Sequence, residues 1–139
     1  MKTYVSILII TFLFYSCSNN PEAFVEHIEG YWEIVDVTKA NNSIKSYNIS
    51  TNVDYFKINN DLTGFRKKVK PSLDGTFTIT QHESPFQLKI ENNNLNIYYT
   101  VNNTTFKETI ENASETELII TNDEGFKYKY KPFEKLTFE

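Results

Sequence analysis

The chain has 139 residues, 40% hydrophobic and 15% aromatic, and its 14 Lys and Arg against 18 Asp and Glu give a formal net charge of -4. That length fits one domain and excludes a second catalytic domain or a repeat array. Four Gly, four Pro and 23% charged residues exclude collagen-like and low-complexity chains and charge-driven disorder. The acidic balance argues against a general nucleic-acid-binding protein, whose affinity depends on neutralising phosphates with Lys and Arg.

The first seventeen residues indicate export. Lys2 precedes an apolar run over residues 4–15, which is too short for a comfortable transmembrane helix and is typical of a signal peptide. Ser16 and Cys17 stand where a cleavage site is expected, and Cys17 is the only cysteine of the chain. An internal disulfide is therefore excluded, which leaves Cys17 as either a remaining free thiol or an attachment point.

The run Phe14-Tyr15-Ser16-Cys17 resembles a bacterial lipobox, in which the cysteine becomes the acylated first residue of the mature chain. The resemblance implies a lipoprotein held on a membrane by its acyl chains, because a second acyl chain makes such anchoring stable. Ser18 occupies the position where an inner-membrane retention signal would place Asp, so the resemblance favours the outer membrane of the cell envelope, facing the periplasm or the surface. We thus expect a signal peptide over residues 1–16, a lipidated Cys17 and tether over 17–21, and one folded domain over 22–139.

The mature chain is predicted to open with one short helix. Asn20 can cap it, Pro21 suits its first turn, Phe24 and Ile28 are four residues apart, and Gly30 can end it.

After Gly30 the hydrophobic period changes to two and stays there, which predicts antiparallel strands. Clusters of Asn, Asp, Ser and Gly separate the expected strands, and residues 41–52, rich in Asn and Ser, are expected to form a long loop with an exposed tip. The predicted strands cover residues 31–38, 53–59, 64–70, 76–81, 85–91, 95–101, 105–112, 117–121 and 125–131.

Alternation within these strands predicts one buried face. A meander of eight or nine such strands closes most simply into a small β-barrel, because closure removes exposed edges; an open two-sheet sandwich is the alternative. The residues expected to point inward are Trp32, Ile34, Phe56, Ile58, Phe65, Val69, Phe77, Ile79, Phe86, Leu88, Ile90, Leu95, Ile97, Tyr99, Val101, Phe106, Ile110, Leu118, Ile120, Phe126, Tyr128 and Tyr130.

Gly30-Tyr31-Trp32, at the start of the first strand and after a short helix, resembles the Gly-x-Trp signature of lipocalins. With the strand count, it makes residues 22–133 similar to the lipocalin-like lipoproteins of Bacteroidetes-type bacteria. The resemblance implies an all-β, lipocalin-like barrel whose narrow end is closed by Trp32 next to Gly30. The arginine that often covers this tryptophan in lipocalins is not carried over, because Arg66 is the only arginine and does not belong to the last strand.

An eight-stranded barrel has an interior that its own side chains fill or that holds one small ligand. Aromatic residues dominate the predicted inner face, so both outcomes stay open: a packed interior, or a pocket in which tyrosine hydroxyls orient a ligand. The candidate pocket residues are Phe56, Phe77, Tyr99, Tyr128 and Tyr130. The ligand expected there is small and hydrophobic or amphipathic.

The one concentrated basic segment lies in the predicted strand over residues 64–70. Alternation places Arg66, Lys68 and Lys70 on the face opposite Phe65 and Val69, which predicts a solvated outer surface. The alternative hypothesis is a contact with an anionic partner such as lipid head groups or an acidic glycan.

Catalytic and metal-binding signals are weak. His27 and His82 have no convergent ligands or orienting partner in the sequence, and neither a Gly-x-Ser-x-Gly motif nor a phosphate-binding glycine loop occurs. We expect no cofactor, no metal and no enzymatic activity, and a monomer. Two functions remain: a lipid-anchored barrel that binds a small ligand, or a filled barrel that contacts an envelope protein or glycan through its loops, above all residues 41–52.

Overall fold

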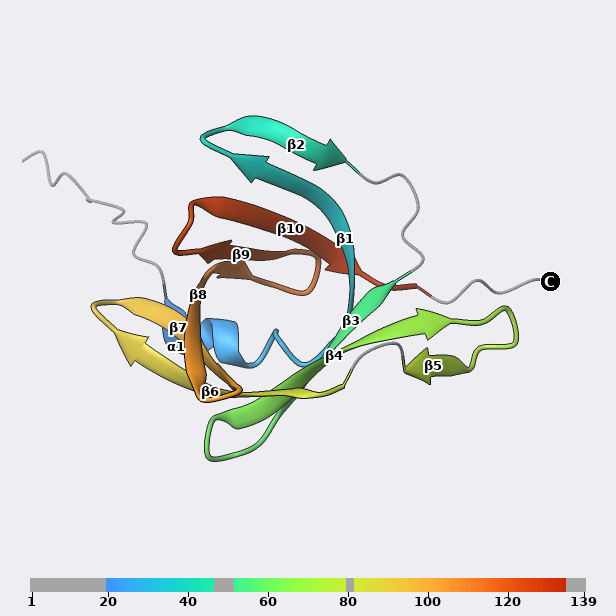
Figure 1. Ribbon diagram of the computed structural model, residues 1–139, viewed down its shortest axis with the longest axis horizontal. Coiled ribbons are helices and arrows are strands. Elements are labelled where there is room, and N and C mark those ends of the chain that lie inside the picture. The colour runs from blue at the N-terminus through green and yellow to red at the C-terminus, as the bar shows by residue number, and fades with distance from the viewer. Residues whose placement is uncertain (1–19, 47–51, 80–81, 135–139) are drawn as a thin grey trace, which may run out of the picture.

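The computed structural model describes residues 20–46, 52–79 and 82–134. It contains one short helix and ten strands in antiparallel pairing (Figure 1). The elements are α1 (Pro21–Val25), β1 (Gly30–Lys39), β2 (Asn42–Ser46), β3 (Val53–Ile58), β4 (Thr63–Pro71), β5 (Phe77–Ile79), β6 (Ser84–Glu91), β7 (Asn94–Val101), β8 (Thr104–Ala113), β9 (Leu118–Asn122) and β10 (Phe126–Pro132).

Eight strands close into a barrel. Their order is β1-β3-β4-β6-β7-β8-β9-β10, and β10 pairs with β1 to complete the ring. The prediction of a closed antiparallel meander preceded by one short helix is therefore confirmed. The open sandwich is wrong, because the pairing of β1 with β10 leaves the barrel without a free edge between its first and last strands.

Two strands lie outside the ring. β2 pairs with the second half of β1, and β5 pairs with the second half of β4, so both project from the barrel in Figure 1. The prediction that residues 41–52 form a loop is wrong for β2, which begins at Asn42 directly after a tight turn at Ala40 and Asn41. All five residues of β2 are exposed, so no hydrophobic alternation reveals the strand in the sequence. Residues 47–51 lie outside the described part.

Helix α1 covers one end of the barrel. The Asn20 side chain accepts a hydrogen bond from the Ala23 backbone N–H at 3.4 Å, as its predicted capping role requires. The helix ends at Val25, earlier than Gly30, which instead begins β1 with a φ of +134°. Phe24 and Val25 pack against the core, and α1 lies next to β7 and β8.

The core fills the end of the barrel next to α1. Trp32 is buried there, and its indole N–H donates to the Ile28 carbonyl oxygen at 2.8 Å. Gly64 allows the Phe86 ring to approach β4, because a Cβ at position 64 would lie 2.7 Å from that ring and against the Lys57 carbonyl oxygen. The other buried core members are Phe56, Leu88, Leu95, Ile97, Tyr99, Ile110, Ala113, Leu118, Ile120 and Tyr130.

The face assignment of β4 and β5 differs from the sequence prediction. Phe77 lies outside the barrel, where its ring stacks on Tyr31 with centroids 4.6 Å apart and contacts Phe133 edge-on at 6.0 Å. Phe65 is also on the outside, 6.0 Å from the Tyr55 ring, and Ile79 is exposed. Strand β4 therefore carries apolar side chains on its outer face, contrary to the expectation that apolar residues point inward.

Among the described residues, no helix is both long and apolar enough to cross a membrane. The segment that carries the predicted signal peptide and Cys17 lies outside the described residues.

Candidate functional site

The barrel interior is divided into a packed half and an open half. On the strands that enter both halves, the inward residues near α1 belong to the core, whereas the inward residues at the end away from α1 line a pocket. On β7 the core residues are Leu95 and Ile97 and the pocket residue is Val101, with Tyr99 shared between the two halves. This division follows from alternation, since residues two apart on a strand face the same side at successive heights.

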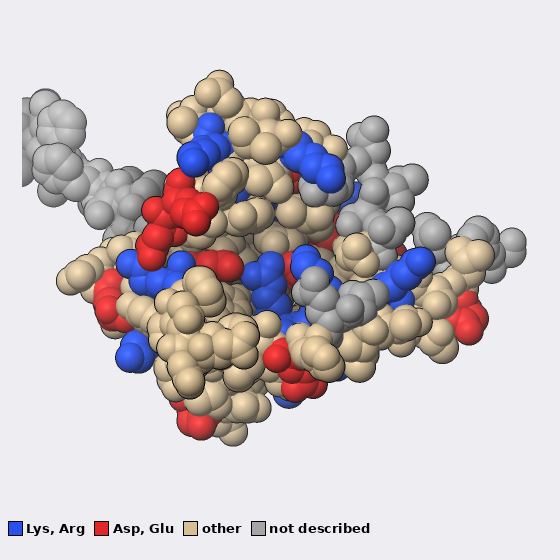
Figure 2. Space-filling model, viewed as in Figure 1, with Lys and Arg blue, Asp and Glu red and all other residues tan. Residues whose placement is uncertain are grey.

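The pocket at the open half has a volume of about 490 Å³, within the range of small-molecule sites. Its apolar lining residues lie on two sides: Ile34 and Val37 on β1, and Val101 and Phe106 on β7 and β8 across the barrel. Figure 2 shows the same face as a hollow containing basic side chains, with acidic side chains at its edge. The remaining lining residues are Arg66, Lys67, Lys68, His82, Ser84, Tyr99, Glu108, Tyr128 and Tyr130.

A bulge in β1 turns Val37 into the pocket. The register between β1 and β10 shifts between Ile34 and Asp36, so one extra residue is inserted there. After the bulge, Val37 pairs with Tyr128 and lines the pocket together with Ile34. Asp36 faces away and accepts hydrogen bonds from Ser43 and Ser46 of β2.

Arg66 forms the floor of the pocket, and one edge of its guanidinium is held firmly. Nη2 donates to Asp54 Oδ2 at 2.6 Å and to the Tyr130 hydroxyl at 2.7 Å. The guanidinium lies over the Phe56 ring, 5.0 Å from its centroid, at the boundary with the packed half. Lys68 adds a second cation on Asp54, with Nζ 3.1 Å from Oδ1. These short contacts place Arg66 in one defined orientation.

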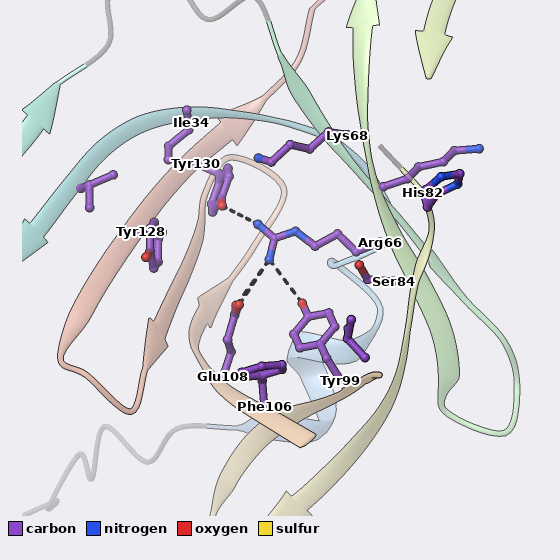
Figure 3. Close-up of a pocket in the computed structure, with 13 residues that line it drawn as sticks. Ile34, Arg66, Lys68, His82, Ser84, Tyr99, Phe106, Glu108, Tyr128 and Tyr130 are labelled. Atoms are coloured by element: carbon purple, nitrogen blue, oxygen red, sulfur yellow. Dashed lines mark hydrogen bonds and ion pairs between the residues drawn. The ribbon is translucent and has the colours of Figure 1, made fainter. Parts of the chain in front are cut away.

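The other edge of the guanidinium is held loosely. Nη1 is 3.3 Å from the Tyr99 hydroxyl and 3.5 Å from both carboxylate oxygens of Glu108 (Figure 3). These distances lie at the long limit of hydrogen bonding, whereas charge-assisted bonds are usually 2.7–2.9 Å. Arg66 Nη1 is thus held less tightly than Nη2, and Arg66 lines the pocket.

The two carboxylates around Arg66 have opposite pKa shifts. Burial acts to raise the pKa of Asp54, but the charges of Arg66 and Lys68 outweigh it and hold that pKa below its ordinary value. Burial raises the pKa of Glu108, and the more distant Arg66 only partly offsets this. Burial also raises the pKa of Tyr99, to about 12, and raises that of Tyr130 further. Asp54 is therefore firmly anionic, whereas the charge of Glu108 is poorly stabilised.

Three of the five candidate pocket residues line the pocket: Tyr99, Tyr128 and Tyr130. Phe56 is fully buried beneath Arg66 and does not reach the pocket. Phe77 is outside the barrel and takes no part in it. The predicted barrel-closing pair, Gly30 and Trp32, lies at the end next to α1, where Trp32 bonds to Ile28.

The prediction that Arg66, Lys68 and Lys70 share a solvated outer face is wrong. Arg66 and Lys68 point into the barrel, because on β4 they pair with Phe56 and Asp54 of β3, which face inward. Lys70 is exposed, and it pairs with Thr78 of β5. The interior accepts two cations here because two carboxylates and two tyrosine hydroxyls satisfy them.

Sequence reasoning overlooked the two acids of the site, although a signal existed. Asp54 has the same parity as Phe56, which was predicted to point inward, and Glu108 lies between the inward positions Phe106 and Ile110. An acid at an inward position on each of two strands requires a buried cation as partner. Arg66 would have been the natural candidate.

The two histidines lie apart. His27 follows α1 and is 3.7 Å from Glu26, and His82 is exposed at the rim of the pocket. Within residues 20–46, 52–79 and 82–134, no three His, Cys, Asp or Glu side chains are grouped as a metal site would require.

A closed eight-stranded antiparallel barrel, with a short helix across one end and a pocket at the other, defines the lipocalin-like architecture. The family model described as a lipocalin-like domain matches residues 28–120, and the chain belongs to that family. Searches of curated proteins and of solved structures gave no significant match.

Proposed function

We propose that this protein is a lipid-anchored, lipocalin-like lipoprotein of the cell envelope that binds one small apolar or amphipathic molecule in its open half. The observation that carries the binding role is the pocket of about 490 Å³, which is lined by apolar side chains as well as by polar and charged ones. A molecule with one apolar and one polar end matches both kinds of side chain. The pocket counts against the filled barrel, whose interior would leave no such volume.

A binding role, rather than a catalytic one, fits the arrangement of the floor. Arg66, Asp54 and Tyr130 already satisfy one another through short contacts, so they hold a fixed surface rather than a group prepared for chemistry. A general base or nucleophile needs a partner that activates it and a free path to substrate. The Arg66 guanidinium stays protonated at every physiological pH, which suits a group that recognises a ligand rather than one that transfers a proton.

Blocking the pocket tests the binding role. Val101→Trp places an indole at the rim, and we expect it to weaken the binding of an environment-sensitive fluorescent amphiphile to the full chain by about tenfold or more. Ile90→Trp is the matched control, because Ile90 is 40% exposed against 41% for Val101 and does not line the pocket. Fluorescence titration of both variants measures the difference, and equal affinities would contradict the proposed site.

The natural ligand can be sought directly. Native mass spectrometry of the protein extracted from its own membrane should show a co-purified small molecule in the wild type. The same molecule should be depleted in Val101→Trp and retained in Ile90→Trp.

The proposed anchor rests on the sequence, because Cys17 follows a signal-peptide-like segment and is the only cysteine of the chain. Ser18 after it supports placement in the outer membrane. Cys17→Ala should move the protein from the membrane fraction to the soluble fraction after cell fractionation, because it removes the site of acylation. Ser16→Ala retains the cysteine and a small residue before it, and serves as the control. Membrane retention of the Cys17→Ala variant would contradict lipidation.

A further inference from the structure

We propose that the ligand of this pocket carries a carboxylate head group, which binds the Nη1 edge of Arg66 in the place now taken by Glu108. This inference rests on the proposed binding function and names the class of ligand: an amphipathic monocarboxylate, with its apolar chain between Ile34 and Val37 on one side and Val101 and Phe106 on the other.

The geometry of Arg66 carries the proposal. The Nη2 edge is saturated by Asp54 and Tyr130 at 2.6 and 2.7 Å, and Asp54 is buried behind it. The Nη1 edge has only contacts of 3.3–3.5 Å and lies at the pocket surface. A carboxylate that is free to approach would form shorter, charge-assisted bonds with Nη1 than Glu108 forms, because Glu108 is held by its own strand.

The charges around the pocket favour an anion. Arg66 and Lys68 point into the pocket, whereas the Lys67 amino group lies outside the barrel, over the Tyr55 and Phe65 rings. Glu108 is the only acid among the lining residues that the structure describes. Asp54 lies behind the floor and is engaged by both Arg66 and Lys68. A cationic head group at Glu108 would lie next to the Arg66 guanidinium, and this close like-charge contact is unfavourable.

Glu108 is suited to give way. Its contacts to Arg66 are long, and burial raises its pKa, so the ionised form is poorly stabilised where it lies. A head group that replaces it restores a close counter-ion for Arg66. The hydroxyls of Ser84 and Tyr128 also line the pocket, from β6 and β10, and each is a hydrogen-bond donor.

A series of ligands with one chain and three head groups tests the proposal. Octanoate, octanol and octylammonium are titrated calorimetrically into the full chain at pH 7. We expect octanoate to bind about tenfold or more tightly than octanol, and octylammonium to bind weakest. Octylammonium or octanol binding as tightly as octanoate would overturn the proposal.

Glu108→Gln tests the role of the displaced carboxylate. The variant keeps the shape of the side chain and removes the competing charge, so octanoate should bind about tenfold more tightly while octanol changes less than about threefold. Glu111→Gln is the matched control, because Glu111 lies on the same strand but pairs with Lys127 at 3.1 Å. Unchanged or weaker octanoate binding in Glu108→Gln would overturn the displacement.

The Val101→Trp variant separates this proposal from the proposed function. If octanol and octylammonium bind as well as octanoate, and Val101→Trp weakens all three, the pocket binds amphiphiles and the carboxylate inference alone is wrong. If none of the three probes binds, or Val101→Trp changes none of them, the binding function itself is contradicted and the inference with it.

Discussion

Asp54→Ala is expected to destabilise the protein by about 3–5 kcal/mol, the cost of breaking a buried ion pair from one side. Asp54 is buried and is 2.6 Å from Arg66 and 3.1 Å from Lys68, so its removal leaves two cations at the barrel interior without their closest counter-ion. Chemical denaturation of wild type and variant measures the free energy of unfolding.

Glu29→Ala is the matched control. Glu29 forms an ion pair with Lys57 at 2.9 Å, but both side chains are nearly half exposed, so its loss should cost only about 0–1 kcal/mol. Equal costs for the two substitutions would show that Asp54 is not the buried counter-ion of Arg66.

Asp54→Ala should also change the pH dependence of the free energy of unfolding. The folded-state pKa of Asp54 is below its unfolded value, so its contribution is fully present above the unfolded pKa of about 3.9 and is lost as pH falls through the folded pKa. Glu108 has the opposite sign, because its raised folded pKa makes stability fall as pH rises from its unfolded value through that pKa. Asp54→Ala should therefore flatten the acid limb of the stability curve, and it should also lower the pKa of Glu108, because the Asp54 charge helps to raise that pKa.

Phe56→Ala is expected to destabilise the protein by about 3–5 kcal/mol, the usual cost of emptying a buried aromatic position. Phe56 is fully buried, contacts Phe86 with ring centroids 6.3 Å apart, and supports the Arg66 guanidinium at 5.0 Å. The substitution removes packing beneath the pocket floor as well as within the core.

Phe106→Ala distinguishes the packed half from the open half. Phe106 lines the pocket and is 55% exposed, so its removal should cost less than about 1 kcal/mol while it weakens the binding of an apolar probe. Thermal and chemical denaturation of Phe56→Ala and Phe106→Ala measure the difference in their loss of stability. Similar losses of stability at the two positions would contradict the division of the barrel into two halves.

Most of the strand order can be read from the sequence because local chemistry specifies it. Asn92-Asn93 and Asn102-Asn103 adopt positive φ values of 49° and 64° in each pair, as two-residue hairpin turns between β6, β7 and β8 require. Alternating apolar residues then place Leu95, Ile97 and Tyr99 inward on β7. Strand β2 cannot be predicted in this way. The turn before it begins at Ala40, which is not a typical turn residue, and no side chain of the strand is buried.

The faces of β4 were decided by the tertiary structure. Phe65 and Val69 alternate with Arg66 and Lys68 along the strand. In a sheet with one buried and one solvated face, the apolar pair is expected to face the core. In the folded chain, aromatic side chains of Tyr31, Tyr55 and Phe77 gather outside this part of the barrel and provide an apolar environment there. The apolar face of β4 thus has a place outside the ring.

By itself, the sequence determined an all-β antiparallel barrel with a short capped helix, because turn residues and alternation act over a few neighbouring positions. Only the tertiary structure decided that Arg66 lies inside. Its partners Asp54, Glu108 and Tyr130 come from three other strands, up to 64 residues away, and a buried cation is stable only where such partners converge. The pocket floor is a product of that convergence, which no local pattern in the chain specifies.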